Sequence, residues 1–402
     1  LNLNSGTIHV AIKLDGDIPE QCSFDIAFDG GKAATFKQAP VGGRIELEAT
    51  VPNAHPWSPN DPHLHTIEVS TPDDCIRERF GLRTIETRGQ QILLNGEAIE
   101  LRGFNRHEAH AELGPAQTTA LMLTDLQWLK SMSCNVVRCV HYPHDEAFFD
   151  LCDELGMLVW SESLGWGNTA DQLADQQFMA LQEEQTRLMV RNGCNHPSII
   201  IWAFLNEGES HTEEALPLYQ RLTGAIRQED PSRLVSYASN RGTRDLCFDL
   251  VDVIALNTYP GWIGPVDWDT PSDQAIAPHV NALIASFCGD SPHANKPLIF
   301  SEIGACGLYG CHDLARSQWT EEYQADYMAE AARAVLDNPR TCGLTLWQFH
   351  DTRSYGPSGQ VRTKPRGINN AGVLDEYRRP KLACQAVADY FATRMNDAVG
   401  ER

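Results

Sequence analysis

The chain has 402 residues, of which 42% are hydrophobic and 21% are charged, and its formal net charge is −22. This composition is typical of a soluble globular protein, and the length predicts one large domain with a smaller companion. The acidity argues against nucleic acid or an anionic membrane surface as partner, and no apolar run approaches the roughly 18 residues of a membrane helix.

The first residues, LNLNSGTIHVAI, already have the pattern of a strand, and they show neither an initiator methionine nor a signal-peptide pattern. We therefore expect a later part of a longer product, in the cytoplasm, with the periplasm as the alternative. Twelve cysteines are scattered along the chain, and none forms a CxxC pair with a histidine partner. This pattern predicts free thiols in a reducing compartment, with no metal site and no cofactor.

Residues 1–87 are predicted to form a small β-sandwich. Short runs alternate apolar and polar side chains with period two, and Gly, Pro, Asp and Asn separate them. The dipeptide Asn95-Gly96 is a strong hairpin signal at the start of the second predicted domain, residues 88–402. The predicted sandwich strands are Thr7–Leu14, Cys22–Phe28, Arg44–Val51 and His65–Ser70.

From Leu101 onward, short apolar strands alternate with helical stretches, which is the pattern of βα units. Eight such strands predict an α/β fold, a (β/α)8 TIM barrel. An open doubly wound sheet is the alternative, but GFNRH after the first strand is not a phosphate-binding glycine loop. The predicted strands are Arg102–Arg106, Val136–Tyr142, Leu158–Ser163, Ile199–Glu207, Leu234–Ser239, Val253–Tyr259, Leu298–Glu302 and Gly343–Phe349, and the predicted helices are Thr119–Met132, Asp145–Leu155, Gln172–Arg191, Thr212–Gln228, His279–Ser286, Glu321–Asp337 and Pro380–Met395.

Two of the apolar strands end in a carboxylic acid. IIIWAFLNE ends at Glu207, and PLIFSE ends at Glu302. The carboxyl ends of barrel strands meet at one rim, so the two acids can face each other there. If their oxygens lie about 5–5.5 Å apart, one can attack an anomeric carbon while the other protonates the leaving oxygen, as in a retaining glycosidase.

Collinear motifs extend over nearly the whole chain: GFNRHE at 103–108, RCVHYP at 138–143, WAFLNE at 202–207, NTYPGW at 257–262, SEIG at 301–304 and WQF at 347–349. In these motifs the chain resembles glycoside hydrolase family 2, the family of β-galactosidases, β-glucuronidases and β-mannosidases. Trp57-Ser58-Pro59 resembles part of the family's immunoglobulin-like domain. The resemblance implies an immunoglobulin-like sandwich before the barrel and an exo-acting enzyme.

The resemblance also implies a role for each matching residue. Glu302 is the expected nucleophile and Glu207 the expected general acid/base. Asn206 is expected to bind the sugar 2-hydroxyl, Tyr259 to hold Glu302, and Arg138 to lower the pKa of Glu302. The remaining substrate-binding candidates are His141, Glu162, Trp262, Trp347 and Asn369.

Two departures from the family pattern bear on the substrate. β-Glucuronidases carry an Asn-x-Lys motif that recognises the sugar carboxylate, and here Asn369 is followed by Ala371 at the lysine position. We therefore expect a neutral sugar such as β-galactose or β-glucose. A glucuronide or galacturonide is the alternative, with its carboxylate bound by loop cations, which are Arg353, Arg362, Lys364 and Arg366.

The second departure is that the family's N-terminal jelly-roll domain is absent from the sequence. We expect a carbohydrate or glycoside as the partner, and leave open a separate jelly-roll fragment of the same protein and a homo-oligomer. A catalytically inactive carbohydrate-binding barrel and a transglycosidase are the remaining alternatives. The latter shares the glycosyl-enzyme intermediate and differs only in its acceptor.

Overall fold

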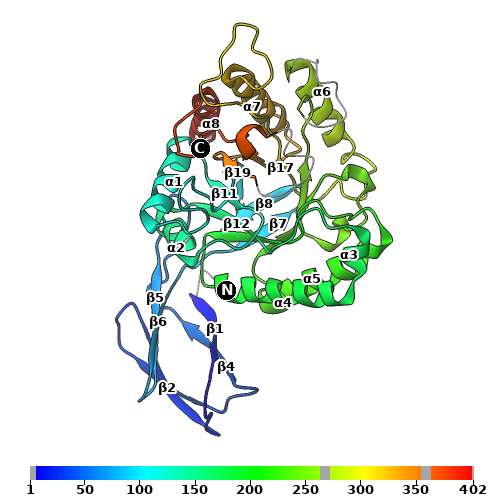
Figure 1. The fold of residues 1–402 in the computed structure, drawn as a ribbon. Helices are drawn as coiled ribbons and strands as arrows, with labels where there is room; N and C mark the ends of the chain where they lie inside the picture. Colours follow the sequence, from blue (N-terminus) through cyan, green and yellow to red (C-terminus); the bar gives the residue numbers. More distant parts are fainter. Residues whose placement is uncertain (1–5, 263–271, 355–363, 401–402) are drawn as a thin grey trace.

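The computed structural model describes residues 6–262, 272–354 and 364–400, and its first six strands form the N-terminal domain. They form two antiparallel sheets, β1–β4 and β3–β2–β5–β6, below the barrel in Figure 1. Apolar side chains from both sheets share a core. This confirms the predicted sandwich. The pattern missed β3, because ATFKQ is short and largely exposed. The strands are β1 Thr7–Lys13, β2 Cys22–Phe28, β3 Ala34–Gln38, β4 Arg44–Thr50, β5 His65–Ser70 and β6 Cys75–Phe80.

A three-stranded sheet of β7 (Ile85–Arg88), β8 (Gln91–Leu94) and β9 (Glu97–Ile99) follows the sandwich, and β7 crosses the boundary predicted between residues 87 and 88. The predicted turn joins β8 to β9, with φ of 54° at Asn95 and 84° at Gly96. Such left-handed angles favour Asn and Gly, which explains the signal. Apolar residues of β7 and β8 pack against the interior of the barrel, so this sheet covers one of its ends.

The barrel has eight parallel strand positions. The fifth strand is interrupted at Tyr237 and is therefore labelled as two strands, β14 and β15. The first strand pairs with both the second and the last, which closes the ring. Along β13, Ile199 and Trp202 pack among the helices, whereas Ile201 and Ala203 face the interior core. The strands are β10 Leu101–Arg106, β11 Val136–Cys139, β12 Leu158–Glu162, β13 Ile199–Ala203, β14 Leu234–Ser236, β15 Ala238–Ser239, β16 Ile254–Asn257, β17 Leu298–Glu302 and β18 Gly343–Leu346.

Helices surround the barrel (Figure 1). Asp175 ends α3 and caps α4, so the helix predicted at 172–191 is two helices. α6 starts earlier than predicted, because Pro278 lies inside it rather than before it. Among the described residues, no helix is long and apolar enough to cross a membrane. The helices are α1 Thr119–Ser131, α2 Glu146–Leu155, α3 Ala170–Ala174, α4 Gln176–Gly193, α5 Leu216–Glu229, α6 Ser272–Ala285, α7 Glu321–Leu336 and α8 Leu382–Gly400.

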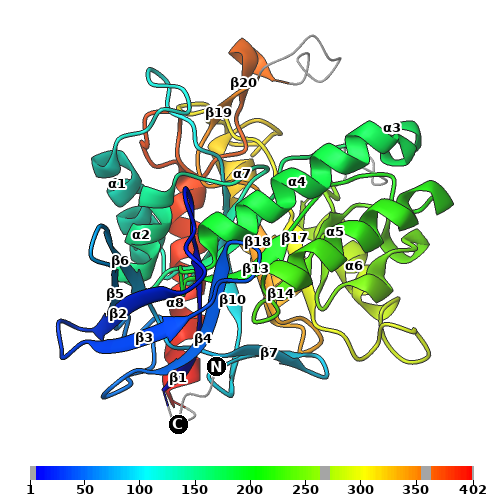
Figure 2. The ribbon, with the colours of Figure 1, turned by 90° about the horizontal axis from the view of Figure 1, so that it is seen from below.

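A short hairpin follows the last barrel strand. β19 (Thr352–Arg353) pairs antiparallel with β20 (Ile368–Asn369), and a 3-10 turn at Pro365–Gly367 precedes β20. Figure 2 shows this hairpin on the opposite side of the barrel from β7. It therefore stands at the carboxyl ends of the strands, where active sites of this fold are built. Arg362, one of the predicted loop cations, lies outside the described residues.

Candidate active site

The end of β13 places Asn206 and Glu207 at the rim of the barrel. The strand stops at Ala203, earlier than predicted, because the backbone turns at Leu205 (φ 46°) and Glu207 (φ 54°). Backbone N–H groups of Asn206 and Glu207 then donate to Gly165 and Ala238 on the two neighbouring segments. Left-handed angles are costly for such side chains, and residues held in them often lie at functional sites.

Arg138, at the end of β11, is the fully buried centre of the site. Its Nη1 donates to Glu302 Oε1 at 2.8 Å and to Asn105 Oδ1 at 2.7 Å, while Nη2 donates to Asn206 Oδ1 at 2.8 Å. Its Nε donates to Glu162 Oε1 at 2.6 Å. Two carboxylates thus compensate the burial of one guanidinium, which joins β10, β12, β13 and β17 into one rigid network.

Glu302 is 3% exposed and is held at both oxygens. Besides the Arg138 contact to Oε1, Tyr259 Oη donates to Oε2 at 2.6 Å. Burial, then the charges of Glu302 and Glu207, raise the pKa of Tyr259 well above its ordinary value, so the phenol remains a donor. A carboxylate oriented by two charge-assisted hydrogen bonds is suited to act as a positioned nucleophile.

The surroundings of Glu207 favour its protonated form. Burial raises the pKa of Glu207, and the negative charge of Glu302 raises it further. Asn257 Nδ2 donates to Glu207 Oε1 at 2.9 Å and opposes this shift in part. A carboxyl group with a raised pKa can carry a proton to a leaving group, so the two acids differ as a proton donor and a nucleophile must.

Asn206 presents a free donor beside these acids. Its Oδ1 accepts from Arg138 at 2.8 Å and from Asn257 at 3.1 Å. Its buried Nδ2 has no acceptor in the described part of the chain. A buried amide donor without a partner costs free energy, and a sugar hydroxyl would satisfy it.

Aromatic rings line the neighbouring wall. His141 and Trp347 stack with centroids 5.7 Å apart and planes 13° apart, and His107 meets both rings edge to face. His141 Nδ1 lies 2.9 Å from Glu162 Oε2 and its Nε2 lies 3.9 Å from Glu302 Oε1. Burial opposes ionisation of Glu162, but Arg138 and His141 hold its pKa below the ordinary value. The aromatic wall therefore adjoins the Glu302 carboxylate, where a pyranose ring would lie.

Two predicted substrate-binding residues have other surroundings. Trp262 is 5% exposed and packs edge to face on Trp319 at 4.7 Å, so little of its ring remains for a sugar. Asn369 lies on β20, and its Oδ1 accepts from the backbone N–H of Ala371 at 3.3 Å. Ala371 itself is only 2% exposed.

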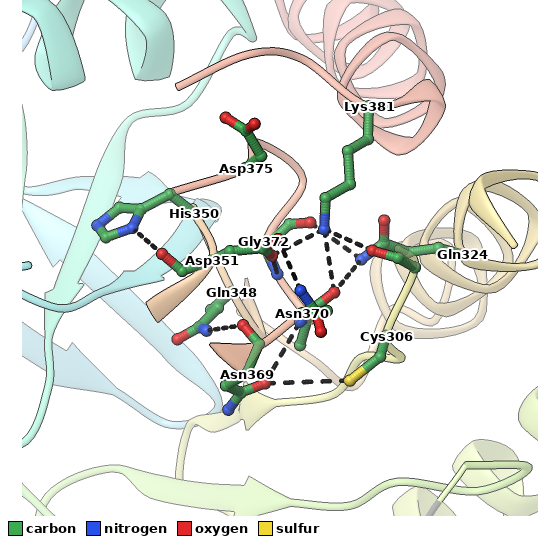
Figure 3. Close-up of polar contacts among 12 residues, drawn as sticks. Cys306, Gln324, Gln348, His350, Asp351, Asn369, Asn370, Gly372, Asp375 and Lys381 are labelled. Carbon is green, nitrogen blue, oxygen red and sulfur yellow. Dashed lines mark hydrogen bonds and ion pairs between the residues drawn. The ribbon is translucent and has the colours of Figure 1, made fainter. Parts of the chain in front are cut away.

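Lys381 reaches toward the segment that carries Asn369 and Asn370 (Figure 3). Its fully buried ammonium donates to Asp351 Oδ1 at 2.7 Å and to the carbonyls of Gly307 at 2.6 Å and Asn370 at 3.1 Å. Burial raises the pKa of Asp351 to about 6, although Lys381 opposes the shift. These bonds fix the chain that carries Asn369.

Asn105 was missed as a site residue by the sequence reasoning. Its Nδ2 donates to the carbonyls of Ser301, Thr345 and Leu346, which ties β10 to β17 and to β18. Its Oδ1 accepts from Arg138. The signal was an amide inside a predicted barrel strand, LRGFNR, because a polar side chain buried there needs partners.

One group of potential metal ligands occurs among the described residues: Asp150, Asp153 and His196. His196 precedes β13 and Glu207 follows it, so the group lies at the other end of the barrel. Asp150 is paired with Arg79 at 2.7 Å and Asp153 with His196 at 2.6 Å. The first pair joins the sandwich to the barrel domain and the second lies within the barrel domain, and we assign no metal there.

A closed parallel barrel with one carboxylate held by arginine and tyrosine, and one acid with a raised pKa, defines the class of barrel glycosidases that work by double displacement. Family models agree. Residues 85–394 match the model "Glycosyl hydrolases family 2, TIM barrel domain", and residues 1–83 match the model "Glycosyl hydrolases family 2". The chain belongs to glycoside hydrolase family 2, which confirms the resemblance in the motifs.

Individual relatives agree with this assignment. The chain is 30% identical over 363 residues to a β-glucuronidase of Streptococcus agalactiae, and the match covers 85% of this chain and 59% of the relative. It is 29% identical over 375 residues to a β-glucuronidase of Sus scrofa, and this match covers 89% of this chain and 55% of the relative. A GH2 β-galacturonidase from Eisenbergiella tayi bound to galacturonate has a TM-score of 0.87 at 34% identity, covering 98% of this chain and 68% of that one. A Faecalibacterium prausnitzii β-glucuronidase has a TM-score of 0.83 at 27% identity, covering 97% and 64%. The chain thus spans less than two thirds of the length of these two curated relatives.

Proposed function

We propose that this chain carries the catalytic centre of a retaining β-glycosidase that removes a terminal β-linked uronic acid. The observation that carries the chemistry is the pair of rim carboxyl groups, with Glu302 oriented by Arg138 and Tyr259 and Glu207 raised in pKa. The sugar class is supported by the relatives, which are named β-glucuronidase or β-galacturonidase.

The prediction of a neutral sugar is not supported by these comparisons, which favour the uronic acid alternative. That prediction depended on Ala371, which occupies the expected lysine position. The inference from Ala371 was incomplete, because the loss of one cation from a site excludes an anionic ligand only if no other cation is in reach. The loop after β18 supplies further cations, of which Lys364 is half-buried.

In the first step, Glu302 attacks the anomeric carbon while Glu207 protonates the glycosidic oxygen, and the aglycone leaves as an alcohol. In the second step, Glu207 takes a proton from water, whose oxygen displaces Glu302 from the same carbon. Asn206 Nδ2 donates to the sugar 2-hydroxyl, a bond that strengthens as the oxocarbenium-like transition state forms. Two inversions at one centre give net retention.

A panel of nitrophenyl β-glycosides of galactose, glucose, glucuronate, galacturonate, xylose and mannose tests the proposal on the 402-residue chain. We expect the highest kcat/KM with a uronide, and no turnover for Glu302→Ala. A 2-fluoro uronosyl fluoride should label Glu302 covalently, which separates an enzyme from an inactive binding barrel. Glu112→Gln, at an exposed position in the loop after β10, is the matched control.

Wild-type turnover by Glu302→Ala would contradict the assigned nucleophile, and a preference for galactoside or glucoside would contradict the sugar class. A high ratio of transfer product to free sugar would indicate the transglycosidase alternative. The separate jelly-roll fragment, the homo-oligomer and the cytoplasmic location stay predictions.

A further inference from the structure

Cations of the loop after β18 differ in their surroundings. Arg353 and Arg366 are exposed, whereas Lys364 is half-buried. No hydrogen bond or ion pair joins the Lys364 ammonium to any residue within 6–262, 272–354 or 364–400. Burial lowers the pKa of Lys364, as expected for a cation that loses water without gaining a partner. In a chain of net charge −22, an unpaired and partly desolvated lysine suggests a ligand of negative charge.

Lys364 begins the 3-10 turn of the hairpin that stands at the carboxyl ends of the barrel strands. Its charge acts on the His107 ring, which follows β10, and on the Cys306 thiol, which follows β17. His107 in turn meets His141 and Trp347 edge to face, with centroids 5.7 Å apart in both cases. The ammonium is therefore within electrostatic range of the ring that meets the aromatic wall.

Asn369 offers a second donor near the same place. Its Oδ1 accepts from Ala371 N at 3.3 Å and faces Cys306 Sγ at 4.0 Å (Figure 3). A backbone N–H can only donate, so this contact identifies the oxygen, and the opposite Nδ2 has no acceptor within the described ranges. Lys364 and Asn369 flank one tight turn, which the bond from Gly367 N to Lys364 O closes at 2.9 Å.

Other groups nearby cannot take this role. Lys381 is fully buried, and its ammonium already donates to Asp351, Gly307 and Asn370. Ala371, which replaces a lysine in the family motif, brings only a methyl group that is almost inaccessible. The Lys364 ammonium and the Asn369 amide are left, and neither donor has an acceptor among residues 6–262, 272–354 and 364–400.

We propose that Lys364 Nζ and Asn369 Nδ2 bind the C6 carboxylate of the uronic acid whose ring lies on the His141–Trp347 wall. This inference rests on the proposed function and identifies the residues that read the sugar's charge. A carboxylate supplies the acceptors that both groups lack, and a charge-assisted bond is stronger than one to a neutral hydroxymethyl group. The cation thus comes from the other end of the turn and not from position 371.

The test compares matched substrate pairs that differ only at C6: nitrophenyl β-galacturonide with β-galactoside, and β-glucuronide with β-glucoside. Lys364→Met should lower kcat/KM for a uronide roughly 10- to 100-fold, as expected for loss of a hydrogen bond to a charged group, and should leave the neutral sugar unchanged. Lys364→Arg should retain most of the preference. Arg366→Gln is the control, because this exposed cation lies in the same turn.

Three results are decisive, with thermal melting used to check that each variant is folded. If the wild type prefers neutral sugars, the proposed function fails. If the wild type prefers uronides and Lys364→Met keeps that preference, the proposed function stands and the assignment of Lys364 is wrong. An equal loss of kcat/KM on both members of a pair would likewise overturn it, because a merely structural lysine would not distinguish substrates by charge.

Discussion

Asn206→Ala is expected to slow the enzyme mainly through one lost donor. The buried Nδ2 has no protein acceptor among the described residues, so its bonding capacity is available to the substrate. A hydrogen bond to a group that gains charge contributes about 1.5–3 kcal/mol, which corresponds to roughly 10- to 150-fold in kcat/KM. The substitution also deprives Arg138 and Asn257 of the Oδ1 acceptor, which adds a structural cost.

A double-mutant cycle separates the two effects. Wild type and Asn206→Ala are each assayed on a nitrophenyl β-uronide and on its 2-deoxy analogue. The structural cost appears with both substrates and cancels in the ratio, whereas the bond to the 2-hydroxyl is present only with the first. The variant should therefore lose roughly 10- to 150-fold more on the 2-hydroxy sugar. Equal losses on both substrates would refute the assigned contact.

Three further outcomes follow from the electrostatics. Because the charge of Glu302 raises the pKa of Glu207, Glu302→Gln should lower that pKa in an NMR titration, and an unchanged value would contradict the coupling. Asn257 donates to Glu207 and lowers its pKa. Asn257→Ala should therefore move the alkaline limb of the kcat/KM profile to higher pH, because Glu207 then stays protonated up to a higher pH. A shift of that limb to lower pH would refute this. Lys381→Met leaves the Asp351 carboxylate buried without its cation and should lower the free energy of unfolding by about 3–5 kcal/mol in denaturant titrations. The double variant with Asp351→Asn should recover part of that loss. An unaltered denaturation midpoint for Lys381→Met would contradict the pairing.

Local pattern was sufficient for much of the architecture. Period-two runs predicted four sandwich strands, the Asn95-Gly96 turn was located correctly, and eight apolar runs predicted the barrel. These features depend on short-range properties, namely which face a side chain buries and which residues accept a left-handed backbone. The strand ending at Glu207 was predicted too long, because the backbone turns by bonding to Gly165, after β12, and to Ala238, on β15.

The candidate site divides in the same way. The two glutamates, their position at one rim and the family could be predicted from sequence, since barrel topology brings all strand ends together. Trp262 could not be distinguished from a pocket aromatic, because only the packing of Trp319 against it shows that it is buried. Asn105 gained its meaning only through three carbonyls on β17 and β18.

The cation expected to bind a uronic acid illustrates the difference between local sequence pattern and tertiary contacts. The sequence determined that Ala371 stands where the family has a lysine, and that cations lie in the preceding loop. The tertiary structure decided which of the described cations are already used: Lys381 is saturated, Arg366 is exposed, and Lys364 is half-buried without a partner. Desolvation and pairing depend on atoms distant in sequence, so no local pattern contains them.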